Sequence, residues 1–144
     1  IRLADEGMPI TLAVSLHAPN DAIRNDLMPI NKLYPILQLL DACKYYIIKT
    51  KRRITFEYAL ISKINDSEKC ARELSNLLKD LLCHVNLIPL NPVEGKQIER
   101  STSSQIRRFE KILMDSGIST TIRREMGSDI EAACGQLRRS LLMR

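Results

Sequence analysis

Short apolar runs alternate along this chain with segments whose apolar residues recur at helical spacing, and this alternation constrains the fold most strongly. We expect strands at residues 10–17, 53–61, 84–90 and 118–124. Helices between successive strands make the strands parallel and the crossovers right-handed. The sequence therefore predicts an α/β fold with about four parallel strands that alternate with helices.

Residues that start and stop helices stand at the boundaries of these segments. We expect helix caps at Asn20 or Asp21, at Asn65 or Asp66, within residues 101–104, and at Ser128 or Asp129. Pro29 should stop the first helix, Pro35 suits the first turn of the second, and Gly117 suits the end of a later one. Cys43 falls on the apolar stripe of the second helix, which favours packing in the core.

Polar residues follow the expected strands, where parallel α/β folds place their ligand-binding groups. Ser15 and His17 lie two residues apart and so share one side of the first strand. They lack the third member of a catalytic triad, and a structural hydrogen bond is the alternative to a functional role for His17. Asn91 presents an amide that donates and accepts hydrogen bonds, and its alternative is a local turn before Pro92.

The charge of the chain is compatible with a nucleic-acid partner. Its 144 residues carry a net charge of +5, and the pI is about 9.2. Basic residues cluster at Lys49, Lys51, Arg52 and Arg53, at Arg107, Arg108 and Lys111, and at Arg123, Arg124, Arg138 and Arg139. These clusters are either solvated faces or a surface that contacts phosphates. Aromatic residues make up only 4% and Trp is absent, which argues against a stacking platform for single strands.

The apolar runs and the cysteines point away from a membrane and from an oxidising compartment. No apolar run approaches the length of a membrane span, and the first residues lack a signal-peptide pattern. The four cysteines, Cys43, Cys70, Cys83 and Cys134, match neither a disulfide framework nor a zinc site. Such scattered cysteines predict a reducing cytoplasm. Cys134 stands among alanines and directly before Gly135, a position open to packing or to chemistry.

Four stretches carry more information together than singly. They are AVSLHAPND at 13–21, RITFEYALI at 53–61, NLIPLNP at 86–92 and SDIEAACGQL at 128–137. In this order they resemble the C-terminal part of a radical S-adenosylmethionine (SAM) RNA methyltransferase. The family is the bacterial one that methylates carbon 2 of adenosine in 23S ribosomal RNA and in some transfer RNAs. Two alternatives stay open: the sister enzyme that methylates carbon 8, and a non-catalytic module that binds RNA or another partner.

The resemblance implies roles for particular residues. Those that would contact SAM are Ser15, Leu16, His17 and Asn91. Cys134 would carry the methyl group as a thioether before its transfer to adenine. The family holds a 4Fe–4S cluster through a CxxxCxxC motif, which does not occur in this chain, so we expect no metal ligand here. The family's GEP segment and its second, resolving cysteine have no counterpart either.

The resemblance also implies how the chain is organised. Residues 1–144 would form one domain, the C-terminal half of a radical SAM barrel with a C-terminal extension, without the cluster-binding half and the N-terminal accessory domain. We therefore expect a truncated product, a split reading frame or an isolated domain that alone has neither cluster nor methyltransferase activity. Its open sheet edges predict a dimer or another compensating contact. The parent enzyme's implied partners are 23S ribosomal RNA, transfer RNA and an electron-donating reductase, with no membrane.

Overall fold

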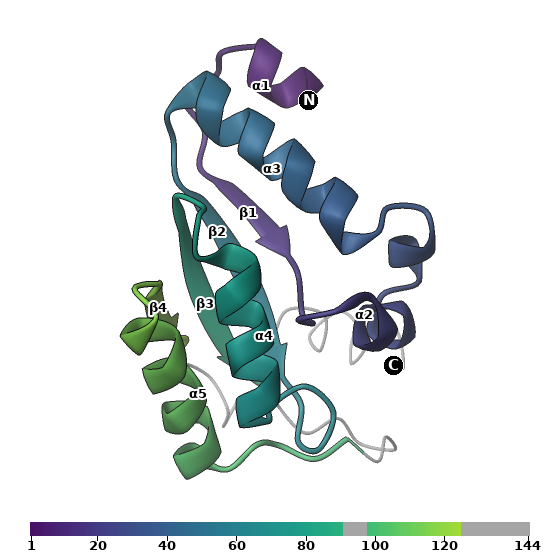
Figure 1. The fold of residues 1–144 in the computed structure, drawn as a ribbon, viewed down its shortest axis with the longest axis vertical. Helices are drawn as coiled ribbons and strands as arrows, with labels where there is room; N and C mark the ends of the chain where they lie inside the picture. Colours follow the sequence, from purple (N-terminus) through teal and green to yellow (C-terminus); the bar gives the residue numbers. More distant parts are fainter. Residues whose placement is uncertain (91–97, 125–144) are drawn as a thin grey trace, which may run out of the picture.

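The computed structural model describes residues 1–90 and 98–124, and Figure 1 shows one sheet with helices packed against it. The elements in chain order are α1 (Arg2–Asp5), β1 (Leu12–Ser15), α2 (Asp21–Leu27), the 3₁₀ helix η1 (Pro29–Lys32), α3 (Ile36–Thr50), β2 (Ile54–Leu60), α4 (Glu68–Leu78), β3 (Cys83–Pro89), α5 (Ser103–Asp115) and β4 (Ser119–Ile122). The expected α/β fold, with four parallel strands alternating with helices, is confirmed.

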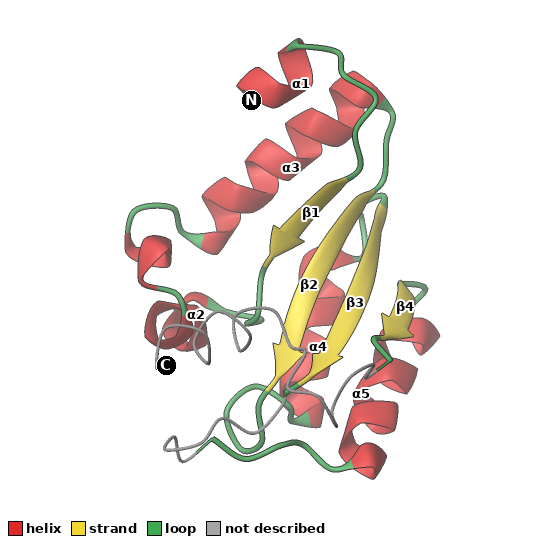
Figure 2. Cartoon of the chain, turned by 180° about the vertical axis from the view of Figure 1, so that it is seen from behind, coloured by secondary structure: helices red, strands yellow, loops and turns green. Residues whose placement is uncertain are grey.

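The sheet has the strand order β1-β2-β3-β4, and all three strand pairs are parallel. The crossovers run in one direction across the sheet, so their common hand places the connecting helices on the same face. Figure 1 shows α4 and α5 in front of the sheet, and Figure 2, from the reverse side, shows them behind it. The carboxyl ends of β1, β2 and β3 consequently lie at one edge of the sheet.

The two faces of the sheet differ in burial. On the face toward the helices, all side chains of β2 and β3 are buried, and Phe56, Tyr58 and Val85 are 0% exposed. The alternating positions are half-buried, and no described helix packs against them. We call this second surface the open face. Its residues on the four strands are Ala13, Ser15, Thr55, Glu57, Ala59, His84, Asn86, Ile88, Ser119 and Thr121.

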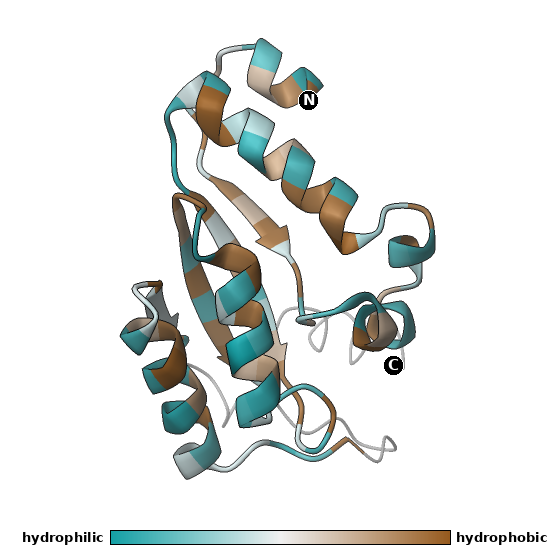
Figure 3. Ribbon diagram, viewed as in Figure 1, coloured by the Kyte–Doolittle hydropathy of each residue, from teal (hydrophilic) through white to brown (hydrophobic). Residues whose placement is uncertain are grey.

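The apolar core lies between the sheet and the helices, and Figure 3 shows hydrophilic residues on the outward surface of α4. Tyr58 and Phe109 pack across it with ring centroids 5.2 Å apart. Cys43, Cys70 and Cys83 are buried as free thiols, which confirms packing for Cys43. Burial raises the pKa of Cys43 and of Cys83 to about 11. Within residues 1–90 and 98–124, no helix has the length and apolar composition needed to cross a membrane.

Several helix boundaries follow the expected signals. Asn20 caps α2, because its side chain accepts a hydrogen bond from the backbone N–H of Ile23 at 3.0 Å. Thr102 caps α5 in the same way, within the expected range. Gly117 follows α5 with a φ of 82°, the left-handed conformation that ends many helices. The helix expected to begin at Ser128 or Asp129 lies outside the described residues.

Three features differ from the sequence expectation. Ser67 caps α4, and neither Asn65 nor Asp66 does, because their Oδ1 atoms instead accept hydrogen bonds from the backbone N–H groups of Ile61 and Lys63. The first strand is shorter than residues 10–17, because His17 takes a left-handed φ of 59° that no strand can continue through. The short elements α1 and η1 had no signal in the apolar pattern.

Candidate ligand site at the carboxyl ends of the strands

The segment from Ser15 to His17 ends β1 and is hydrogen-bonded to the backbone of β2. The N–H groups of Leu16 and His17 both donate to the carbonyl oxygen of Glu57, at 3.0 and 3.3 Å. The left-handed conformation of His17 costs a non-glycine residue about 1–2 kcal/mol. All of Leu16, its backbone included, is buried, so the structure exposes no part of it for the predicted contact with SAM, whereas Ser15 is exposed. The segment thus places two polar side chains at a strand end around an apolar anchor.

The imidazole of His17 has a defined hydrogen-bonding role. Its Nδ1 accepts a hydrogen bond from the backbone N–H of Ala59 at 3.0 Å. Burial lowers the pKa of His17; the negative charge of Glu57 opposes this effect and Arg24 adds to it. A neutral ring that accepts at Nδ1 carries its proton on Nε2. His17 therefore holds an N–H donor at the end of β1.

Asn65 ties the ends of β1 and β2 together, and it is fully buried. Its Nδ2 donates to the carbonyl oxygens of His17 and Ala59, at 2.8 and 2.7 Å. Its Oδ1 accepts from the N–H of Ile61 at 2.7 Å, and its backbone carbonyl accepts from the hydroxyl of Tyr58 at 2.8 Å. Every hydrogen-bonding atom of the amide is thus used to fix the turn that carries His17.

Arg24 holds the same segment from the other side, and only 4% of it is exposed. Its Nε donates to the carbonyl oxygen of Leu16 at 3.1 Å, and its Nη2 donates to that of Ser15 at 3.2 Å. Its Nη1 donates to Oδ1 of Asn31 at 2.7 Å, and the amide of Asn31 donates to Asp21 at 2.8 Å. The guanidinium fork therefore fixes two successive carbonyls, an arrangement that lysine cannot reproduce.

The structure brings together three of the predicted site residues, Ser15, Leu16 and His17. Asn91 and Cys134 lie outside the described residues, and their roles stay predictions. Sequence reasoning missed the residues that hold the segment: it interpreted Asn65 as a possible helix cap and gave Arg24 no role. In the described part of the chain, no three histidine, cysteine or acidic side chains group in a way that could hold a metal ion.

Sequence comparisons find close relatives over nearly the whole chain. The protein named probable dual-specificity RNA methyltransferase RlmN of Clostridium tetani is 61% identical over 138 residues, which is 96% of this chain and 40% of the relative. The protein of the same name from Thermoanaerobacter sp. is 55% identical over 141 residues, or 98% of this chain and 41% of the relative. The chain thus spans about two fifths of the curated relatives it matches. No family model matches it.

Two solved structures share the fold. A radical SAM methyltransferase from Sphaerobacter thermophilus matches with a TM-score of 0.90 and 54% identity, over 94% of this chain and 40% of that one. A domain of a pyruvate-formate lyase-activating enzyme from Bacteroides vulgatus matches with a TM-score of 0.63, over 79% of this chain and 67% of that one. Because its identity is only 16%, the second likeness concerns the fold alone.

The chain has the fold of part of a radical SAM methyltransferase, as its strand order and its similarity to the solved structure show. Within that class it corresponds to the C-terminal part of the proteins named dual-specificity RNA methyltransferase RlmN. The family resemblance drawn from the sequence is therefore confirmed.

Stability should fall as the pH drops from about 6.5 toward 5, where histidines titrate. Burial lowers the pKa of both His17 and His84 in the folded chain. The unfolded chain then binds more protons than the folded one. The stability that these neutral histidines contribute is therefore fully present above the pKa of the unfolded state, and it is lost as the pH falls through the pKa of the folded state. Urea midpoints between pH 7.5 and 5 measure this loss. His17→Gln should flatten the profile, and an unchanged slope would contradict the role of His17.

Proposed function

We propose that this chain is part of an enzyme that transfers a methyl group from SAM to carbon 2 of adenosine in 23S ribosomal RNA and in some transfer RNAs. The supporting observation is the 61% identity, over 96% of the chain, to a relative named as a dual-specificity RNA methyltransferase. The strand-end segment supports it as well, because it places a hydroxyl and an N–H donor at the edge where parallel α/β folds bind ligands.

In this proposal Ser15, Leu16 and His17 form one SAM-binding segment together with Asn91, and Leu16 is its buried anchor. The described groups suit such a ligand, because an exposed hydroxyl and an imidazole N–H can bond its hydroxyl and carboxylate oxygens. The thiolate of Cys134 would take the methyl group of a first SAM, which leaves as S-adenosylhomocysteine, and would hold it as a thioether until transfer. A 4Fe–4S cluster would be bound by another part of the parent enzyme and would supply the electron for reductive cleavage of a second SAM.

The remaining proposals concern the chain as a unit. Residues 1–144 form one domain of the parent enzyme, and this domain alone has no methyltransferase activity. Exposed apolar side chains at the start of α3, which include Leu33 and Leu37 at 70% exposure each, support a dimer of the isolated chain. The parent enzyme works in the cytoplasm with a reductase as its electron donor.

The test is a chimera in which this chain replaces the matching segment of the Clostridium tetani relative. Nucleoside analysis of 23S ribosomal RNA treated with the reduced chimera should show 2-methyladenosine, and mass spectrometry should find a methyl thioether on Cys134. The chain alone, treated identically, is the control and should yield neither. Accumulation of 8-methyladenosine would instead favour the sister enzyme. Unmodified RNA combined with a free Cys134 thiol would contradict the proposal.

A further inference from the structure

One polar row crosses the open face from strand to strand. Ser15, Glu57, Asn86 and Thr121 occupy the same register position on β1, β2, β3 and β4. Side chains in one register line up on the same face of a sheet. The row therefore crosses the sheet from Ser15, a residue proposed to contact SAM, to the opposite edge strand, and Glu57 is the first neighbour of Ser15.

Hydrogen bonds along this face connect His84, Thr121 and Asn86 to the carboxylate of Glu57. The amide of Asn86 donates to both carboxylate oxygens of Glu57, at 3.1 and 3.4 Å. The hydroxyl of Thr121 donates to Oδ1 of Asn86 at 3.4 Å. Nε2 of His84 lies 2.8 Å from the same hydroxyl and forms a hydrogen bond with it. Nδ1 of His84 forms a hydrogen bond with the hydroxyl of Ser119 at 2.8 Å.

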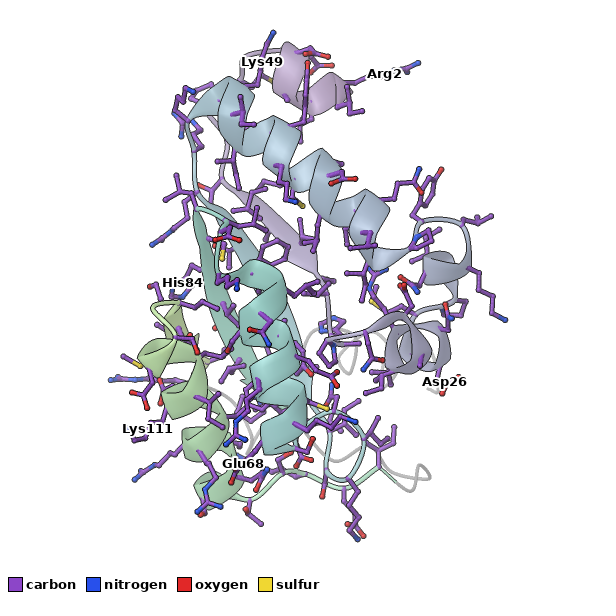
Figure 4. All side chains as sticks on the ribbon, viewed as in Figure 1. Arg2, Asp26, Lys49, Glu68, His84 and Lys111 are labelled. Atoms are coloured by element: carbon purple, nitrogen blue, oxygen red, sulfur yellow. The ribbon has the colours of Figure 1, made fainter. Side chains whose placement is uncertain are left out.

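His84 begins this series near the amino end of β3, and Figure 4 shows it well away from Glu68 at the start of α4. The series therefore lies along the sheet and is separate from the ion pairs between the helices. A carboxylate has about four acceptor positions on its two oxygens. Asn86 approaches each oxygen of Glu57 once, which leaves positions on both oxygens for a ligand.

The backbone of Glu57 fixes this carboxylate beside the strand-end segment. Its carbonyl oxygen accepts the N–H groups of both Leu16 and His17. Among the residues of the open face, Glu57 is the one with an acidic side chain. Burial lowers the pKa of His17 and of His84, so neither ring carries a positive charge at neutral pH that would cancel the carboxylate.

We propose that Glu57 is a SAM-binding residue whose carboxylate pairs with the positive charge of the ligand. SAM carries a sulfonium and an ammonium against one carboxylate, so its net charge is positive. A half-buried carboxylate attracts such a cation more strongly than an exposed one, because water and salt screen it less. The inference rests on the proposed function, because that function supplies SAM as the ligand.

The test compares Glu57→Gln with the unsubstituted sequence in the Clostridium tetani chimera, by equilibrium binding of SAM and of S-adenosylhomocysteine, which lacks the sulfonium charge. Glutamine keeps the shape and loses the charge, so we expect SAM to bind about tenfold more weakly, the scale of a lost charge-assisted hydrogen bond. Glu110→Gln is the matched control, since Glu110 is another half-buried glutamate, on α5. Glu57→Asp keeps the charge and should bind SAM more tightly than Glu57→Gln does.

The outcomes separate this inference from the function beneath it. If Glu57→Gln weakens the binding of SAM but not of S-adenosylhomocysteine, Glu57 pairs with the sulfonium. If it weakens the binding of both equally, Glu57 pairs with the ammonium, which both ligands carry. SAM affinity that matches the Glu110→Gln control would overturn the role of Glu57 and leave the proposed function standing. A chimera with the unsubstituted sequence that binds no SAM would overturn the proposed function, and this inference with it.

Discussion

Replacing Asn65 with alanine should lower the free energy of unfolding by about 4 kcal/mol, because it strands several buried polar groups at once. The N–H of Ile61 and the carbonyls of His17 and Ala59 all lose their amide partner in a position with no exposed surface. Each buried group left without a partner costs about 1–3 kcal/mol. Urea denaturation followed by circular dichroism measures the change.

Two comparisons sharpen this result. Asn65→Asp keeps an acceptor for Ile61 but loses both donors, so it should also destabilise the chain. Asn76→Ala, at an exposed position of α4, should change stability by less than about 0.5 kcal/mol. A loss below about 1 kcal/mol for Asn65→Ala would show that water replaces the amide, and the turn at His17 would then have another support.

Replacing Arg24 with methionine should cost about 3 kcal/mol, and this is the second large effect. Methionine keeps much of the apolar stem but removes the donors to the carbonyls of Ser15 and Leu16 and to Asn31. Arg24→Lys keeps the charge without the fork, so we expect it to recover less than half of the loss. Thermal unfolding in parallel with urea titration would measure both variants.

The control for this prediction is Arg72→Met on α4, where an exposed arginine pairs with Glu68 at 3.2 Å. Surface pairs of this kind contribute about 0–1 kcal/mol. If Arg24→Met and Arg72→Met had equal effects, the buried network around Arg24 would not hold the strand end.

The sequence predicted the elements well because its apolar periodicity reports directly on what each segment buries. Residues 53–61 alternate, with Phe56 and Tyr58 toward the core and Glu57 between them, and that alternation could have indicated a polar second face. The ends of the elements were harder to predict. Whether His17 continues a strand depends on Asn65, which lies 48 residues further along the chain.

The supporting residues of the site escaped prediction for the same reason. Asn65 and Arg24 have ordinary local patterns, and their roles arise only when the folded chain places the carbonyls of Leu16, His17 and Ala59 within about 3 Å of their nitrogens. Ser15, Leu16 and His17 were predicted as site residues through a family resemblance. Periodicity and spacing alone left His17 open between a structural and a functional role.

The buried thiols have a consequence for chemoselectivity. An enzyme that loads a methyl group onto one cysteine must leave its other cysteines unmethylated, and only the thiolate form reacts. With a pKa of about 11, Cys43 and Cys83 are ionised in about one molecule in ten thousand at pH 7. Burial thus protects them twice, by shielding the sulfur and by keeping it protonated. The fold itself therefore keeps alkylation away from Cys43 and Cys83.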